Sequence, residues 1–369
     1  MQDGRAISHT RILAAYPQTP PSGRLSTGAE LALAAGCGAY DGERMTSPQY
    51  VHTCRDIPDL LGLLPTLFGF VPEESIIAIA VDGPRSRLGF RLRMDMPRLD
   101  EKDEVCGLVR WHLQRHGADA AILVILTEDQ GAAAKIMAGL QTTLKPISIR
   151  LAVTATSERY WRWDHGVPLD EGRWDRDAFS PAVAHAVMAG QQIVANRAEL
   201  QQRYAAVRGP QREYMQAATR RAVSEVSTIC SGGVQHVSDD QNRLAGRQHL
   251  IPLLDRALHG DLLLNREQLA QISVWIGIAA VRDEVLRGIS RTNAEAHAQV
   301  WTHAAQYVVP PFEAPVLTLA GLSRWLCGDG TQALMALERA VDADENFLFA
   351  QTLMEALRSG LHPRVWDTF

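Results

Sequence analysis

Residues 75–96 contain two hydrophobic patterns in succession, and these patterns constrain the fold more than any other part of the sequence. The first, SIIAIAVD (75–82), is an almost unbroken apolar run rich in isoleucine, which is typical of a strand buried on both faces. After a short loop, apolar and polar residues alternate from Arg87 to Met96, as they do in a strand with one buried face. The two runs therefore predict a β-hairpin.

The segment before the hairpin, IPDLLGLLPTLFGF (57–70), predicts a short helix that begins near Pro58 and is limited in length by Pro65 and Gly69. No run reaches the roughly 18–20 continuous apolar residues that a transmembrane helix needs. The N-terminus lacks the apolar core of a secretory signal. The five cysteines are scattered without a CxxC pair, which is typical of reduced thiols. We therefore expect a cytoplasmic protein without a membrane partner.

Three apolar segments after the hairpin have the order strand, helix, strand. They are ADAAILVILTED (118–129), QGAAAKIMAGLQTTL (130–144) and ISIRLAVTATS (147–157). Because a strand–helix–strand unit returns to the same sheet by a crossover, this order predicts two parallel strands. An amphipathic helix over 99–117 precedes the unit. The N-terminal half is thus predicted to be an α/β domain whose mixed sheet combines a β-hairpin with a βαβ unit.

Composition divides the chain into four stretches. Residues 1–44 carry proline and glycine with little periodicity, which predicts a mobile leader or an extension of a chain that starts at Met45. The α/β domain then covers 45–160, and a polar, tryptophan-rich linker covers 161–178. From 179 to 369 the segments have helical periodicity and are separated by glycine, proline or polar turns, which predicts an all-α domain.

Residues 314–347 are similar to one tetratricopeptide unit, a pair of helices of about 34 residues. The glycine of the first helix, the turn and the small or apolar positions of the second helix are matched by Gly321, Gly328, Asp329, Ala333, Leu337 and Ala340. The pattern differs at Arg324, where an aromatic residue is usual, and at Glu345, where proline is usual. One such unit cannot bury its own apolar face, so we expect it to stack on neighbouring helices.

The strand ends of the predicted βαβ unit collect polar side chains. In α/β sheets, ligands gather at the carboxyl ends of parallel strands. This rule selects a set of candidate ligand-binding residues at the two strand ends and just beyond them: Thr127, Asp129, Thr154, Arg159 and Trp161. Asp129 has an alternative role as the N-cap of the helix that follows it.

The second strand of the hairpin carries three arginines, Arg87, Arg91 and Arg93, on its polar face. This basic face could bind phosphate or nucleic acid. The alternative is a solvated strand face, or one paired with acids such as Asp95. We prefer the alternative, because the chain's formal net charge of -5 gives no general attraction to nucleic acid.

Sequence motifs of known chemistry are missing. There is no phosphate-binding glycine loop, nucleophile elbow or HExxH helix, so we predict no cofactor and cannot assign catalytic residues. His112 and His116 have the i, i+4 spacing of paired metal ligands. No glutamate base lies between them and no third ligand is evident. Histidines near the C-terminal end of a helix are the simpler interpretation, and we predict no metal.

Several segments together resemble a known family. They are DLLGLLPTLFGFVPEESIIAIAVDG, RLRMDMP, RYWRWD with GVPLDE, VRDEVL and the stretch from APVLTLAGLSRWL to LRSGLHPRVW. In order and spacing, over about residues 54–366, they are similar to the DUF4192 family, an uncharacterised actinobacterial domain of unknown function. The resemblance implies a bacterial cytosolic protein, supports Met45 as the start and implies no established activity. Members often carry a cysteine cluster after the tryptophan-rich segment, and because this chain has none there, no metal role carries over.

We therefore expect a non-enzymatic scaffold whose helical domain binds a protein partner or a second copy of the chain, because stacked helix pairs present peptide-binding grooves. The alternative is a small-ligand sensor or an enzyme that uses the crevice at the strand ends. A deep polar pocket at the strand ends favours the alternative. An open groove along the last helices favours the interaction protein.

Overall fold

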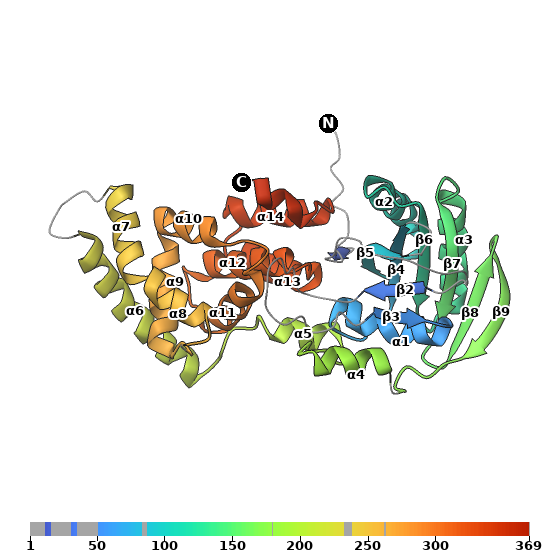
Figure 1. Cartoon of the computed structure of the whole chain (residues 1–369), viewed down its shortest axis with the longest axis horizontal. Coiled ribbons are helices and arrows are strands. Elements are labelled where there is room, and N and C mark those ends of the chain that lie inside the picture. Colours follow the sequence, from blue (N-terminus) through green and yellow to red (C-terminus); the bar gives the residue numbers. More distant parts are fainter. Residues whose placement is uncertain are drawn as a thin grey trace. The chain divides into compact units, whose positions relative to one another are not determined.

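The computed structural model describes residues 12–15, 31–34, 51–82, 87–178, 180–231, 238–261 and 263–368. The chain forms two compact units (Figure 1). One comprises Met1–Leu200 with Arg358–Gly360, and the other comprises Gln201–Leu357 with Leu361–Phe369. Of the predicted leader, only two short strands are described, and the proposed start at Met45 lies outside the described residues.

The first unit is built on a mixed seven-stranded sheet with the order β1-β5-β4-β6-β7-β8-β9. Its strands are β1 (Ile12–Ala15), β4 (Ser75–Asp82), β5 (Arg87–Asp95), β6 (Ala120–Leu126), β7 (Ser148–Ala155), β8 (Arg159–Asp164) and β9 (Val167–Arg173). Only the β6–β7 pair is parallel, and every other neighbouring pair is antiparallel. Two further strands, β2 (Leu31–Ala34) and β3 (Val51–Cys54), pair with each other in a separate small sheet.

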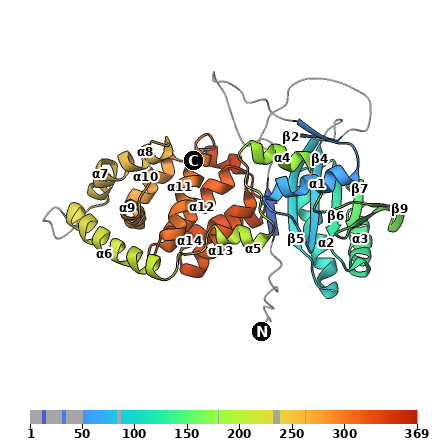
Figure 2. The same cartoon turned by 90° about the horizontal axis from the view of Figure 1, so that it is seen from below.

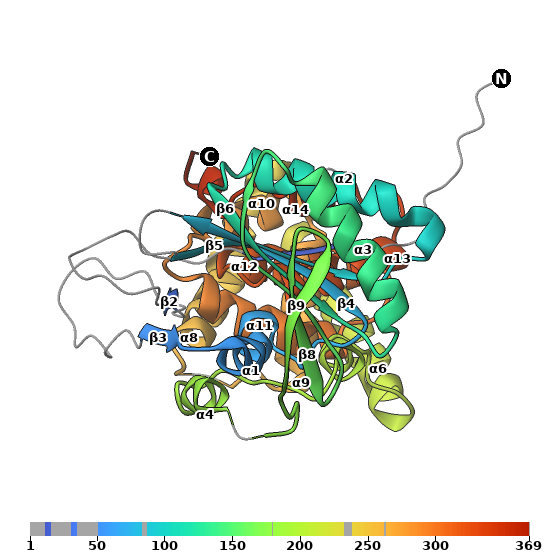
Figure 3. The same ribbon diagram turned by 90° about the vertical axis from the view of Figure 1, so that its right-hand side faces the viewer.

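Helices cover both faces of this sheet, as Figure 3 shows. Helices α2 (Lys102–Arg115) and α3 (Gln130–Thr143) lie over one face, and α1 (Ile57–Phe68) lies over the other. A short 3-10 turn, η1 (Leu99–Glu101), leads into α2, and α4 (Pro181–Met188) packs on α1. Because both faces are covered, the central strands β4 and β6 are buried along their whole apolar length.

The hydrophobic pattern predicted these elements correctly. The hairpin of β4 and β5 pairs Ser75 with Asp95 and Asp82 with Arg87. Helix α1 ends at Gly69, which has a φ of 78° and donates its N–H to the Pro65 carbonyl at 2.9 Å. The βαβ unit is also confirmed, because β6 and β7 are parallel and α3 connects them.

The predicted linker over 161–178 is wrong for most of its length, because β8 and β9 extend the sheet through it. The turn between them is His165–Gly166, whose φ angles are 45° and 85°. Two positive φ values in a two-residue connection match the twist of a β-hairpin. Trp163 packs against the core, and its indole N–H donates to the Thr154 hydroxyl at 3.0 Å. The segment is therefore part of the sheet.

The rest of the chain is helical (Figures 1 and 2). After α5 (Arg197–Gln202) come α6 (Pro210–Ser231), α7 (Asp239–His249), α8 (Ile251–Leu258), α9 (Arg266–Gly277), α10 (Ala279–Gly288), α11 (Ala294–Tyr307), α12 (Glu313–Leu326), α13 (Gly330–Ala343), α14 (Leu348–Arg358) and the 3-10 turn η2 (Pro363–Thr368). None of the described helices is long and apolar enough to cross a membrane.

Helices α12 and α13 correspond to the tetratricopeptide-like segment and pack very closely. A Cβ atom added to Gly321 would lie 2.7 Å from Leu337 Cγ and 3.2 Å from the Ala333 carbonyl oxygen. Helix α12 also contacts α9 and α11, and nearly all of its residues are buried. Arg324, at the position where an aromatic residue is usual, reaches Glu295 of α11 at 3.7 Å. Helix α12 is therefore an interior helix of its unit.

Candidate functional site

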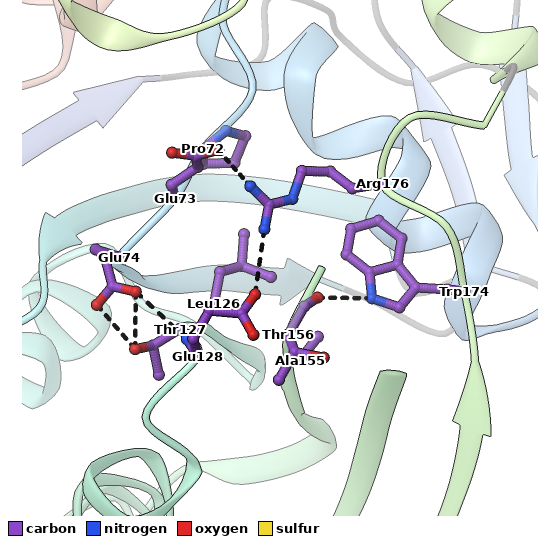
Figure 4. A pocket seen from close by; sticks show the side chains of 10 residues that line it. All are labelled: Pro72, Glu73, Glu74, Leu126, Thr127, Glu128, Ala155, Thr156, Trp174 and Arg176. Atoms are coloured by element: carbon purple, nitrogen blue, oxygen red, sulfur yellow. Dashed lines mark hydrogen bonds and ion pairs between the residues drawn. The ribbon is translucent and has the colours of Figure 1, made fainter. Parts of the chain in front are cut away.

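A cavity of about 130 Å³ lies at the carboxyl ends of β6 and β7, beside the amino end of β4 (Figure 4). This location follows from the topology, because β4 is antiparallel to β6 and therefore begins where β6 ends. Its wall combines acidic, basic, hydroxyl and apolar side chains. They are Pro72, Glu73, Glu74, Leu126, Thr127, Glu128, Ala155, Thr156, Trp174 and Arg176.

Glu74 is held in an unusual backbone conformation at the amino end of β4. Its φ of 39° lies in the left-handed region, which costs a non-glycine residue about 1–2 kcal/mol. Its carboxylate oxygens accept hydrogen bonds from the Thr127 hydroxyl at 2.9 and 2.8 Å, and one of them also accepts from the Glu128 N–H at 3.4 Å. Its carbonyl accepts from the Met96 N–H at 2.8 Å. These contacts fix the direction of the carboxylate.

Arg176 brings a positive charge to the cavity from the segment that follows β9. Its guanidinium lies between two carboxylates in Figure 4: it forms an ion pair with Glu73 and reaches Glu128 Oε1 at 3.6 Å. Glu128 also accepts a hydrogen bond from the Ser157 N–H at 2.8 Å, and the Arg176 N–H donates to the Ser157 carbonyl at 3.2 Å. The arginine therefore ties three separate segments together at the cavity rim.

Trp174 forms the apolar wall on the same side. Its indole N–H donates to the Thr156 carbonyl at 2.9 Å, and its backbone N–H donates to the Glu158 carbonyl at 3.0 Å. The ring lies beside Arg176 in Figure 4. An indole held in this way offers a flat apolar face and a site for cation–π contact.

The formal charges of the wall are unbalanced. Three glutamates, Glu73, Glu74 and Glu128, face one arginine, Arg176, which leaves an excess of two negative charges when all four groups are ionised. The Glu73 and Glu128 side chains are 56% and 62% exposed, so they attract a cation from solvent, with their field reduced by the surrounding water. The arrangement therefore favours a positively charged ligand.

Only one of the five predicted ligand-binding residues, Thr127, lines this cavity. Asp129 caps α3 by accepting from the Ala132 N–H at 2.9 Å, which is the alternative role that the sequence allowed. Thr154 is buried and accepts the Trp163 indole N–H.

The remaining two predicted residues lie on β8, outside the cavity. Arg159 forms an ion pair with Glu171 of β9 at 2.6 Å, and the Trp161 indole N–H donates to the same carboxylate at 2.8 Å. The Arg159 guanidinium carbon also lies 5.9 Å from the centre of the Trp161 ring. Because β8 turns back along β7 after the strand end, their side chains point to Glu171 and not to the cavity.

Sequence reasoning missed Glu73 and Glu74 before β4, and Trp174 and Arg176 after β9. The acidic pair stands in the segment PEES, directly before the isoleucine-rich strand, which was a usable signal. We expected ligand-binding residues only at the carboxyl ends of the parallel strands. Glu73 and Glu74 lie instead at the amino end of β4, which is antiparallel to β6. Trp174 and Arg176 were assigned to the linker.

The predicted basic face does not form as one exposed surface. Arg93 is buried, forms an ion pair with Asp95 and lies 5.6 Å from the centre of the Phe70 ring. Its Nε also donates to the Ser75 hydroxyl at 2.8 Å. The sequence predicted that the polar face of β5 is open to solvent, but that face is covered at Arg93. Arg91 is half-buried, and the side chain of Arg87 lies outside the described residues.

The two histidines of α2 pack against the core of the first unit. The ring of His116 stacks on Phe90 with 3.9 Å between centres, and His112 is fully buried in the core. Burial, with His116 and Arg115 as neighbouring cations, lowers the pKa of His112 to about 4. In the described part of the chain, no group of three or more histidine, cysteine or acidic residues could hold a metal ion.

Comparison with known proteins identifies one family. Its model, described as Domain of unknown function (DUF4192), matches residues 58–364. No curated protein and no solved structure matches the chain significantly. The match covers both the strand-end cavity and the helical unit.

Proposed function

Because this chain belongs to the DUF4192 family, whose description assigns no activity, we propose a function from the cavity itself: the α/β unit binds a small organic cation at the carboxyl ends of β6 and β7. The observation that carries this proposal is the excess of carboxylates over guanidinium in the wall. A ligand with an ammonium or guanidinium group compensates that charge, and an anion does not.

The fixed carboxylate of Glu74 is the recognition group of this proposal. The Thr127 hydroxyl and the Glu128 N–H hold it from the protein side. Each carboxylate oxygen has two lone-pair sites, so Glu74 can accept further hydrogen bonds from a ligand. Glu73 and Glu128 already pair with Arg176. Their role is to add negative potential, while Trp174 contacts the apolar part of the ligand.

The size of the cavity limits the ligand. An apolar cavity of about 150 Å³ accommodates benzene. A cavity of about 130 Å³ therefore fits a cationic group with a short hydrocarbon chain.

A thermal-shift assay on the full chain tests this function, with n-butylammonium, methylguanidinium and butyrate as probes. We expect both cations to raise the melting temperature and butyrate to leave it unchanged, since a ligand at 100 times its Kd stabilises the folded state by about 2.7 kcal/mol. Glu74→Gln should abolish the shift. Glu171→Gln, the same change outside the cavity, should keep it. No shift with either cation, or an equal shift in Glu74→Gln, would overturn the proposal.

We propose a second function for the helical unit, the docking of a protein partner or of a second copy of the chain. It is supported by an open groove of about 510 Å³ on α6. The close helix pair α12–α13 is consistent with a tetratricopeptide-like unit. Since α12 is buried on nearly all sides, it has little surface for a partner. In this proposal the α12–α13 pair therefore has a structural role, and the groove on α6 is the docking surface.

We also propose the cytoplasm as the place where the protein acts. Of the described cysteines, Cys54 and Cys106 are buried, Cys230 and Cys327 are partly exposed, and none of the four is in a disulfide. Free thiols of this kind persist in a reducing compartment.

A further inference from the structure

The groove on the helical unit lies between α6 and the loop that joins α11 to α12. We call it the α6 groove. Helix α6 contributes Gln216, Thr219, Arg220 and Val223, and the loop contributes Val309, Pro310, Pro311 and Phe312. Most of these lining residues are apolar, and Val223 is 38% exposed although it is a large hydrophobic residue.

The loop side of the groove is held in place before any partner binds. Arg212 of α6 donates to the Val308 carbonyl at 2.8 Å and reaches Glu313 at 3.3 Å. Arg339 of α13 binds the same Glu313 carboxylate at 3.3 Å. The Phe312 ring packs against the end of α9, where a Cβ atom on Gly277 would lie 2.7 Å from it. A pre-organised wall lowers the entropic cost of binding.

Two polar groups of the groove have unused hydrogen-bonding capacity. Thr219 is 6% exposed, and its hydroxyl has no hydrogen-bond partner among the described residues. A threonine hydroxyl both donates and accepts hydrogen bonds, so Thr219 offers a hydrogen-bonding group to a ligand in the groove. Arg220, one position along α6, is exposed and forms no ion pair in the part of the chain that the structure describes. By contrast, Arg212 and Arg221 on the same helix are both paired.

The dimensions and the charge define one kind of occupant. From Gln216 to Val223 the helix rises about 10 Å, at 1.5 Å for each residue. An extended peptide covers that length with about three residues, at 3.3 Å each. The apolar part of the lining favours an apolar side chain, and the guanidinium of Arg220 favours a carboxylate.

We propose that the α6 groove binds a short extended segment of another protein in which an acidic side chain is adjacent to one or two apolar side chains. The carboxylate pairs with Arg220. The apolar side chain lies against Val223 and Phe312, and the Thr219 hydroxyl bonds the backbone of the segment. This inference rests on the docking function proposed for the helical unit and is independent of the strand-end cavity.

Peptide display tests the proposal with a library of random heptapeptides and the immobilised full chain. We expect enrichment of sequences in which Asp or Glu is next to Leu, Ile, Val, Phe or Trp. A selected peptide should lose at least tenfold in affinity for Arg220→Glu. Panning against Arg220→Glu should select Lys or Arg at the acidic position. Arg256→Glu makes the same charge change at an exposed arginine of α8 and should bind as the unchanged chain does.

The outcomes separate the groove from the docking function. Peptides that bind Arg220→Glu equally well would show that docking occurs elsewhere, so the groove assignment would fail alone. A library that yields no binder would overturn both the groove assignment and the docking of a peptide segment by the helical unit. If a second copy occupies the groove, the unchanged chain will sediment as a dimer and Arg220→Glu as a monomer, which also contradicts the proposed partner. Circular dichroism checks that each variant is folded.

Discussion

Thr127 and Glu74 lie 53 residues apart in the chain, yet the Thr127 hydroxyl donates to both oxygens of the Glu74 carboxylate, at 2.9 and 2.8 Å. The pair joins the end of β6 to the start of β4, two antiparallel neighbours in the sheet. One contact thus fixes the direction of the carboxylate that we propose as the recognition group.

Replacement of Thr127 by valine keeps the shape of the side chain and removes this hydrogen bond. A hydrogen bond to a charged group is worth about 1.5–3 kcal/mol, so we expect the free energy of unfolding to fall by that amount. Urea denaturation measures it. Thr142→Val, at an exposed position of α3, is the matched control and should change stability little. Equal stabilities of the two variants would contradict the role of the contact.

Gly69 and Gly107 should respond to alanine in opposite directions. Gly69 ends α1 with a φ of 78°, and the nearest atom to an added Cβ is 3.8 Å away, so strain and not collision decides the outcome. We expect Gly69→Ala to destabilise by about 1–2 kcal/mol. Gly107 lies inside α2 with nothing within 4 Å of an added Cβ. Gly107→Ala should stabilise by about 0.5–1 kcal/mol, because glycine loses more backbone entropy on folding. Thermal denaturation of both variants checks the two signs.

Gly321 should not tolerate alanine, because the added Cβ would lie 2.7 Å from Leu337 Cγ and 3.2 Å from a backbone oxygen of α13. Overpacking of this kind costs about 1–3 kcal/mol. Gly288→Ala at the end of α10, where nothing lies within 4 Å, is the control. Chemical denaturation compares them. A neutral Gly321→Ala would mean that the two helices separate without cost.

Acid should destabilise the protein through two buried histidines. Burial lowers the pKa of His112 and of His297 to about 4 in the folded state, below the ordinary value of 6.5. The unfolded chain therefore takes up these protons first as the pH falls. The contribution of the two histidines to the free energy of unfolding is fully present above pH 6.5. It is lost as the pH falls from 6.5 towards 4, by about 3 kcal/mol for each histidine.

The His112→Leu variant tests this pH dependence. It removes one of the two groups and should make the loss of stability between pH 7 and pH 4 smaller, by about 3 kcal/mol. His259→Gln, at an exposed position after α8, should keep the full dependence. Urea denaturation at a series of pH values provides the comparison. If the free energy of unfolding depends on pH equally in His112→Leu and in the unchanged chain, the assigned role of His112 is contradicted.

Local patterns predicted the elements of the first unit because the signal for each is contained in a short window. The apolar run of β4, the alternation of β5 and the proline and glycine around α1 each depend on neighbours within a few residues. The β8–β9 hairpin shows where this reasoning failed. RYWRWD alternates and His165–Gly166 supplies a tight turn, but the polar composition suggested a linker.

The candidate site could be predicted only in part for a different reason. The local sequence shows that polar residues follow β6, and Thr127 does line the cavity. Only the folded sheet brings Glu73 and Glu74 to the same cavity as Thr127, because their position depends on β4 pairing with β6 in antiparallel orientation. It also brings Arg176 back to Glu73, about a hundred residues away in sequence. Strand order and chain return are set by the packing of the whole sheet, and no local window of sequence contains them.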